Sequence, residues 1–313
     1  MFLNLVLLVT GLSMIVFGAD FLVDGASSIA RKSGISEFVI GLTIVGFGTS
    51  CPELVVSVVG ALSGSSDIAL GNVIGSNIFN SLFILGLTAV LAPVAVSSEN
   101  KKRDIPLVIA VSVLLCIAGL FLGNEGGISR IEGIAFLAIF SAYIYYCFRS
   151  GKDDGAAGNT PAMGIPKAVT YVLLGLGGLI FGGELFVDSA TNIARQAGIS
   201  DKVIAITLLA GGTSLPELAT CIVAIVKKRG QLALGNILGS NVFNILLILG
   251  CASVISPLSF KNISYVDLSA LLVSQLLIFT SAYTGRKDSI DRFDGAVMLL
   301  CEAAYLAYLF IVG

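Results

Sequence analysis

The sequence predicts an all-α polytopic membrane protein of ten transmembrane helices, built as two inverted five-helix repeats with both termini outside. Three features support this prediction: a low charge content, a succession of long apolar segments, and a second half that repeats the first. Of the 313 residues, 56% are hydrophobic and 12% are charged. Soluble domains carry about 25% charged residues, so the composition argues against an ordinary soluble protein.

The apolar segments set the number of helices. A helix of about 20 apolar residues crosses the hydrocarbon core of a bilayer, and these segments are too long and too uniformly apolar for barrel strands. The first segment has no basic leading region and matches the sixth, so we interpret it as a retained span and not as a signal peptide. We expect spans at 2–24, 37–62, 68–92, 104–122, 131–148, 166–190, 202–226, 232–256, 264–284 and 293–311.

A shift of 164 positions aligns the two halves without a gap from Gly18 to Pro93. The motif GTSCPEL at 48–54 lies over GTSLPEL at 212–218, and GNVIGSNIFN at 71–80 lies over GNILGSNVFN at 235–244. We therefore divide the chain into a first five-helix repeat (1–149), a short linker (150–165) and a second five-helix repeat (166–313). A repeat with an odd number of spans predicts that the second copy enters the membrane from the opposite side.

The distribution of basic residues gives the orientation. Fourteen of the 18 lysines and arginines fall in loops on one side, and the other four, at 130, 195, 202 and 261, fall on the other side. The positive-inside rule then places the linker in the cytoplasm and both termini outside, in the plasma (inner) membrane. Inverted repeats of this kind are typical of secondary transporters, whose sites lie near mid-membrane where the repeats meet.

Composition narrows the chemistry further. The chain has no histidine, which excludes histidine-based metal sites and nearly all Ser-His or Cys-His catalysis. Its six cysteines all fall within predicted spans without paired spacing, as expected for small buried hydrophobic side chains. We predict no enzymatic activity and no cofactor, and nothing in the sequence indicates a nucleic-acid or protein partner. The lipid bilayer is the expected surrounding.

Each half carries polar side chains four residues apart, a spacing that places both members of a pair on one face of a helix. The pairs are Thr49 with Glu53, Ser76 with Asn80, Thr213 with Glu217, and Ser240 with Asn244. The neighbouring Ser50 and Ser214 can also turn inward.

Pro52 and Pro216 lack an N–H group and predict a kink in each helix. The kinks would free carbonyl oxygens around Gly46–Gly48 and Ala210–Gly212.

Glu53 and Glu217 are the least expected residues in these apolar segments. A mid-membrane carboxylate is costly unless it is compensated, and no lysine or arginine falls at the same depth. The carboxylates are therefore either protonated or bound to cations. The surrounding oxygen donors suit Ca²⁺, Na⁺ or Mg²⁺ better than soft metals.

Other polar and small residues have plainer interpretations. The glycines at 71, 75, 235 and 239 predict close helix packing. We expect the asparagine side chains at 72, 77, 236 and 241 to join helices to one another or to line the ion path. Asp20, Asp24, Glu184 and Asp188 lie near the ends of the first and sixth spans, where we favour helix-end solvation over a role along the ion path.

The two GTSxPEL motifs, each followed by GNxxGSNxFN, resemble the α-repeats of the sodium/calcium exchangers in the cation/calcium antiporter superfamily. The chain looks like a compact prokaryotic member. This resemblance implies ten helices, with the second, third, seventh and eighth forming four cation sites. Matched position by position, it implies side-chain ligands at Thr49, Ser50, Glu53, Ser76, Thr213, Ser214, Glu217 and Ser240, carbonyl ligands at Gly46 and Ala210, and Asn80 and Asn244 at the remaining pair of positions.

The resemblance also implies a function and a mechanism. We expect Ca²⁺ and Na⁺ as transported ions, exchanged at about three Na⁺ per Ca²⁺, with the first and sixth spans sliding past the other eight. Similar exchangers often carry an aspartate at the position of Asn244, and this departure argues against potassium co-transport. The alternatives are an H⁺/Ca²⁺ antiporter that uses the same glutamates, a cation channel and, with least support, an intramembrane hydrolase.

Overall fold

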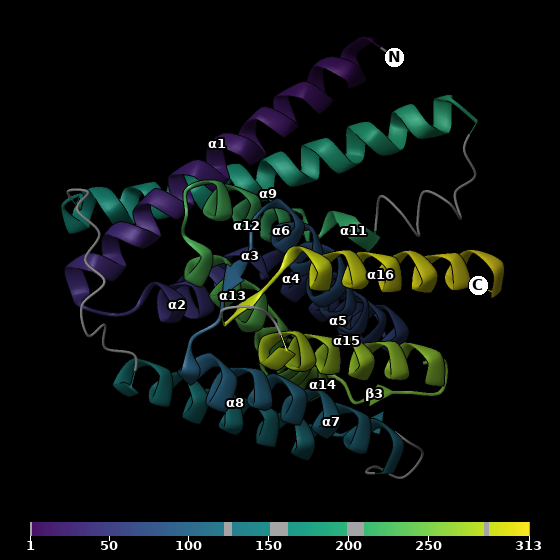
Figure 1. Ribbon diagram of the computed structural model, residues 1–313. Coiled ribbons are helices and arrows are strands. Elements are labelled where there is room, and N and C mark those ends of the chain that lie inside the picture. The colour runs from purple at the N-terminus through teal and green to yellow at the C-terminus, as the bar shows by residue number, and fades with distance from the viewer. Residues whose placement is uncertain (1, 122–126, 151–161, 199–209, 285–287, 313) are drawn as a thin grey trace.

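The computed structural model describes residues 2–121, 127–150, 162–198, 210–284 and 288–312, and Figure 1 shows a helical molecule whose two termini both lie at the right of the view. Among these residues, eight helices are long and apolar enough to cross a membrane. A bent pair, Glu37–Thr49 with Cys51–Leu62, makes a ninth. The protein is therefore a polytopic helical membrane protein.

The first half begins with α1 (Phe2–Ser33). The second predicted span is divided into α2 (Glu37–Ile40), the π-helical η1 (Gly41–Val45), α3 (Gly46–Thr49) and α4 (Cys51–Leu62). The remaining elements are α5 (Ser66–Phe79), the π-helical η2 (Asn80–Ile84), α6 (Leu85–Leu91), β1 (Val94–Ala95), the π-helical η3 (Asn100–Asp104), α7 (Ile105–Phe121), β2 (Gly127–Ile128) and α8 (Arg130–Ser150).

The second half follows the same order. Its elements are α9 (Ile165–Gln196), α11 (Ala210–Gly212), α12 (Leu215–Val226), α13 (Gly230–Val242), the π-helical η5 (Phe243–Ile248), α14 (Leu249–Ile255), β3 (Leu258–Ser259), α15 (Tyr265–Thr284), β4 (Ser289–Ile290) and α16 (Arg292–Val312). Most of the linker, 151–161, and the start of the seventh predicted span, 202–209, lie outside the described residues.

Two helices extend past the predicted ends of their membrane spans. The first and sixth spans were expected to end at 24 and 190, but α1 and α9 continue to Ser33 and Gln196. The helices continue because small and polar residues after the apolar run still form helix once the helix leaves the hydrocarbon core. Apolar length therefore reports the membrane core and not the helix.

Helices α1 and α9 pack along a seam of glycines, and Figure 1 shows them side by side at the top of the molecule. In α1, Gly11, Gly18 and Gly25 recur every seven residues, and a Cβ atom at each would lie within 2.8 Å of the α9 backbone. Gly11 faces Gly182, whereas Gly25 faces Ala168, so the two helices run antiparallel. The contact is thus backbone against backbone, the geometry that small residues permit between membrane helices.

Two short antiparallel strand pairs connect the halves crosswise. The strand β1 of the first half pairs with β4 of the second, and β2 of the first half pairs with β3 of the second. These strands have two residues each, so they were not expected from sequence periodicity. They hold the two halves together beyond the helix ends.

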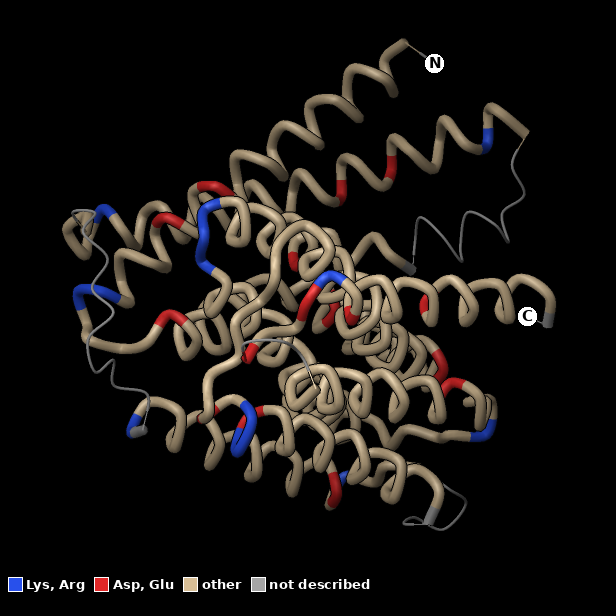
Figure 2. Tube along the Cα trace, viewed as in Figure 1, with Lys and Arg blue, Asp and Glu red and all other residues tan. Residues whose placement is uncertain are grey.

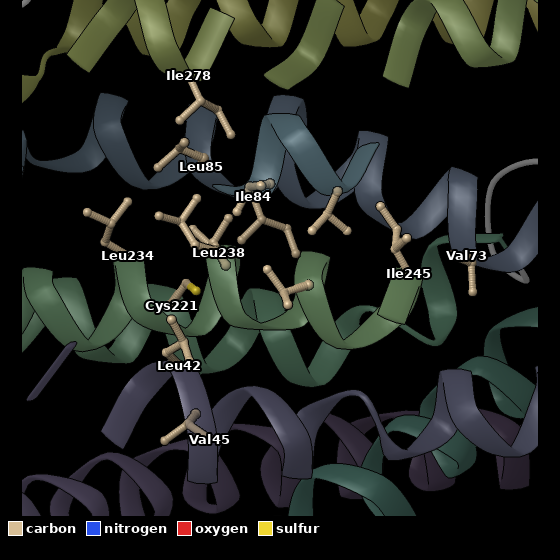
Figure 3. Packing of buried hydrophobic residues seen from close by; sticks show 14 of the residues in the cluster. Leu42, Val45, Val73, Ile84, Leu85, Cys221, Leu234, Leu238, Ile245 and Ile278 are labelled. Atoms are coloured by element: carbon tan, nitrogen blue, oxygen red, sulfur yellow. The ribbon is translucent and has the colours of Figure 1, made fainter. Parts of the chain in front are cut away.

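Helix α13 lies at the centre of the core. Figure 3 shows its Leu234 and Leu238 between Leu42 of η1 on one side and Ile84 of η2 on the other. All 13 residues of α13 except Gly230 and Gln231 are buried. A helix that is buried all round must be held by contacts on every side, which fixes the elements that carry the polar residues.

The glycine seam makes a prediction about stability. We expect Gly18→Ala to lower the free energy of unfolding by about 1–3 kcal/mol, because its Cβ would lie 2.8 Å from the carbonyl oxygen of Gly175. Gly177→Ala on α9 is the matched control, since no described atom lies within 4 Å of its Cβ position. Thermal unfolding in detergent should give a lower midpoint temperature for the Gly18 variant than for the Gly177 variant. Equal midpoint temperatures would contradict the close approach of α1 and α9 at Gly18.

Candidate functional site

The site forms where two helices are interrupted at equivalent positions. The backbone of Ser50 (φ −83°, ψ 9°) ends α3, and that of Ser214 (φ −89°, ψ 10°) precedes α12 in nearly the same conformation. In the first half the axis bends by 48° at this point. The predicted kink is therefore confirmed there, with Pro52 in the first turn of α4, where its missing N–H costs nothing.

The two glutamates are buried and bonded across the halves. Glu53 and Glu217 are each 1% exposed. Ser50 donates its hydroxyl to Oε1 of Glu217 (2.9 Å), and Ser214 donates its hydroxyl to Oε1 of Glu53 (3.0 Å). Each half thus supplies the hydroxyl that stabilises the carboxylate of the other half, and the predicted residues meet in one place.

The remaining carboxylate oxygens belong to a larger set of unpaired atoms. Six predicted ligand side chains present a buried oxygen that has no hydrogen-bond partner among the described residues. They are Glu53 Oε2, Ser76 Oγ, Asn80 Oδ1, Thr213 Oγ1, Glu217 Oε2 and Asn244 Oδ1. A buried polar atom without a partner is costly, and a bound ion is one way in which such an atom is satisfied.

Asparagine side chains fix the direction of two of these oxygens. Asn80 donates its amide group to Oδ1 of Asn241, and Asn244 donates its amide group to Oδ1 of Asn77, at 3.3 and 2.9 Å. Asn77 also donates to the carbonyl oxygen of Asn241. Because the amide nitrogens are engaged, the Oδ1 atoms of Asn80 and Asn244 remain available as acceptors.

Both of these asparagines lie in π-helical turns, Asn80 at the start of η2 and Asn244 within η5. A π-helical turn inserts an extra residue into a helix, and such turns are frequent at functional sites. The same departure from α-helical geometry at equivalent positions re-aims both side chains.

The helix-joining role predicted for the asparagines is confirmed. Asn236 accepts from Thr49 (3.1 Å) and so connects α13 to α3, and Asn72 donates to Glu53 and Ser57 and so connects α5 to α4. Close packing is confirmed for Gly235 and Gly239, because a Cβ atom at these positions would clash with the carbonyl oxygens of Phe38 and Leu42. For Gly71 and Gly75 no described atom lies within 4 Å, so their packing role stays a prediction.

The two predicted backbone ligands are the carbonyl oxygens of Gly46 and Ala210. The carbonyl oxygen of Gly46 accepts a helical bond from the N–H of Ser50 (3.1 Å) and a longer bond from the hydroxyl of Thr49 (3.4 Å). Ala210 lies at the start of α11, and its side-chain surroundings fall outside the described part of the chain.

The donor set suits a hard cation. Within the described residues there is no group of three or more His, Cys, Asp and Glu side chains, and no lysine or arginine is buried. Two carboxylates surrounded by hydroxyl and amide oxygens therefore have no internal positive partner. Calcium takes six to eight oxygen ligands, and the ten predicted side chains supply enough.

A cavity of about 580 Å³ reaches the site from one side. It lies between α9 and the broken helices, and Thr213, Cys51 and Asn72 line it together with Glu184 and Asp188 of α9. The cavity gives the site an opening on the side where α9 ends.

The corresponding acids of α1 have a different environment, which the sequence did not reveal. Lys227 lies 2.7 Å from carboxylate oxygens of both Asp20 and Asp24. Both acids are solvated as expected, with side chains 45% and 43% exposed, but the ion pair with Lys227 was not expected. Burial lowers the pKa of Lys227, but its hydrogen bonds to Asp20 and Asp24 outweigh this effect and raise the pKa above the usual value.

Sequence reasoning also missed Glu302 of α16. Its side chain is 3% exposed, and its Oε2 atom has no hydrogen-bond partner among the described residues. A lone acid within the apolar run of residues 295–311 was the available signal. Glu302 is a third intramembrane carboxylate, on a helix that carries none of the predicted ligands.

Fold and site together define a class of protein: a polytopic membrane transporter for small cations. The chain belongs to the sodium/calcium exchanger family, because the family model described as sodium/calcium exchanger protein matches residues 3–149 and 167–312. The resemblance noted in the sequence is thus confirmed, and the family is one of cation/calcium antiporters.

Similar proteins span the whole chain. The sodium/calcium exchanger MaX1 of Methanosarcina acetivorans is 33% identical, with 99% of each chain covered. The inner membrane protein YrbG of Escherichia coli is 37% identical over 99% of this chain and 98% of its own. A solved structure of the sodium-calcium exchanger NCX_Mj, soaked with zero Na⁺ and Ca²⁺, matches with a TM-score of 0.86 and 33% identity, over 98% of this chain and 99% of that chain.

The site leads to a prediction about ion binding. We expect Glu53→Gln and Glu217→Gln each to weaken Ca²⁺ binding by at least about 100-fold, since a lost charge-assisted contact in a buried site costs about 3 kcal/mol or more. Isothermal titration calorimetry of detergent-solubilised protein would measure it. Glu302→Gln is the matched control, because it removes the same charge at similar burial on another helix. Equal losses in all three variants would contradict the assignment of the site.

Proposed function

We propose that the protein is a secondary active antiporter that exchanges Na⁺ for Ca²⁺ across the plasma (inner) membrane. The observation that supports this most directly is the set of six unpartnered buried oxygens around two cross-bonded glutamates. We assign the ions to Glu53, Glu217 and the hydroxyl and amide oxygens beside them, with carbonyl oxygens of Gly46 and Ala210 completing sodium sites.

Charge balance supports a stoichiometry of about three Na⁺ per Ca²⁺. Two carboxylates balance one Ca²⁺, whereas three Na⁺ leave one net positive charge on the same groups. The exchange is then electrogenic, and the two ions compete because they share ligands.

Several features favour ten helices in two inverted repeats. The interrupted helices, the π-helical turns η2 and η5 and the crosswise strand pairs lie at equivalent positions in both halves. Figure 2 shows basic residues gathered at the left end of the molecule, where α1 and α8 end and α9 begins. With that end in the cytoplasm, the linker at 150–165 is cytoplasmic and both termini are outside.

The glycine seam supports alternating access by sliding. Helices α1 and α9 contact each other backbone to backbone, so they can move as a unit past the helices that carry the ligands. In the present conformation the cavity beside α9 exposes the site to the outside.

The first experiment is radiolabelled Ca²⁺ uptake into proteoliposomes at fixed pH. We expect uptake into vesicles loaded with Na⁺ and little uptake into vesicles loaded with K⁺ or choline, together with a Na⁺-dependent current on a solid-supported membrane. Uptake without a current under opposed Na⁺ and Ca²⁺ gradients would contradict the stoichiometry.

The second candidate is an H⁺/Ca²⁺ antiporter, which the burial of both glutamates favours because a buried carboxyl group can carry a proton. Uptake that follows an imposed pH gradient and is indifferent to internal Na⁺ would support it. The hydroxyl oxygens of Ser76 and Thr213 favour sodium, because a proton does not need these additional ligands.

A further inference from the structure

Inverted repeats predict equivalent contacts at both ends of the site, and one turn breaks this equivalence. The turn between α4 and α5 has the sequence Ser63-Gly64-Ser65, and the turn between α12 and α13 has Lys227-Lys228-Arg229 at the same three positions. The backbone is nearly unchanged: φ is −81° at Ser63 and −78° at Lys227, and 74° at Gly64 and 60° at Lys228.

The basic turn ties α12 to the neighbouring helices. The ammonium group of Lys227 lies 2.7 Å from Asp20 and 2.7 Å from Asp24, and it also donates to the carbonyl oxygen of Asp20 at 3.3 Å. Arg229 lies 2.7 Å from Glu37 at the start of α2. Three contacts from one ammonium group hold α1 against α12.

At the opposite end the corresponding acids have no such partner. Glu184 and Asp188 take the positions of Asp20 and Asp24 in the second half. They line the cavity, and the turn at 63–65, which corresponds to the basic turn, has no charged side chain that could pair with them. Among the described residues neither acid forms a salt bridge, and the cavity separates α9 from α4. Ion pairs therefore tie the end with the lysine, and the acids at the end without it border the cavity.

We propose that Lys227 is a positioning residue that latches α1 to α12 through Asp20 and Asp24 and so keeps the cytoplasmic side of the site closed at rest. The absence of a basic residue from the Ser63 turn leaves the outer side without a matching latch. The protein therefore rests open to the outside, and inward opening requires breaking this contact. This inference takes its orientation from the proposed function.

An alternative explanation is that these basic residues only orient the protein in the membrane. Lys228 separates the two explanations, because it lies in the same turn, is exposed and makes no ion pair with the described residues. The substitution Lys228→Gly introduces the residue found at the equivalent position, Gly64. It removes one positive charge from the same turn and leaves the contacts of Lys227 intact.

Two cysteine positions can report the two sides. Cys51 lines the cavity, and Leu215 is its equivalent in the second half. Membrane vesicles would be treated from each side with a membrane-impermeant methanethiosulfonate reagent, without Na⁺ or Ca²⁺ gradients. Cys251 and Cys301, which are partly exposed, would be replaced by alanine, and the three buried cysteines would be retained.

We expect Cys51 to react from the outside in the parent protein. Lys227→Ser should raise the reactivity of Leu215→Cys from the cytoplasmic side by about 3- to 10-fold, the effect of one to two partly exposed ion pairs, while that of Cys51 declines. Lys227→Arg should retain the parent pattern, and the swap Asp24→Lys with Lys227→Asp should restore it. Lys228→Gly should change neither rate.

Equal behaviour of Lys227→Ser and Lys228→Gly would overturn the latch, as would a rise in reactivity at both cysteines, which indicates general loosening. Because labelling needs no transport, it separates this inference from the proposed function. A protein that fails the Na⁺-dependent uptake test and still shows the labelling pattern has the latch without sodium exchange.

Discussion

The structure depends on one electrostatic constraint: two carboxylates lie in the membrane interior with no buried lysine or arginine among the described residues to neutralise them. A salt bridge would satisfy the charges permanently and leave nothing for an ion to do. Serine hydroxyls satisfy only one oxygen of each carboxylate, so the second oxygen remains able to bind a cation. In the proposed exchange, this unpaired oxygen is what allows each carboxylate to bind a cation and release it.

The rest of the fold keeps these partly satisfied groups in position. Interrupted helices bring Ser50 and Ser214 to the opposite glutamates, and π-helical turns aim Asn80 and Asn244. Helix α13, buried on all sides, prevents the two halves from separating at this level. The seam between α1 and α9, by contrast, is formed mainly by close backbone approach at glycines, with the ring contact of Phe21 and Tyr171 (5.0 Å) beside it.

The sequence predicted what local chemistry controls. Pro52 dictates a break because its ring and missing N–H act within one turn, and the four-residue spacing of polar side chains dictates a shared face. The aligned repeats therefore located nearly all of the candidate site. The contact of Lys227 with Asp20 and Asp24 was beyond prediction, since alignment shows which positions are equivalent but not which helix ends meet. The crosswise strand pairs were missed for a similar reason: two residues carry no periodic signal.

The crosswise serine–glutamate bonds also constrain how such a chain can evolve. Neither half completes its own carboxylate environment, so a substitution at Ser50 is felt by Glu217, 167 positions away. The two motifs therefore cannot change independently of each other, whereas the turns at 63–65 and 227–229 lie outside these bonds and differ in sequence.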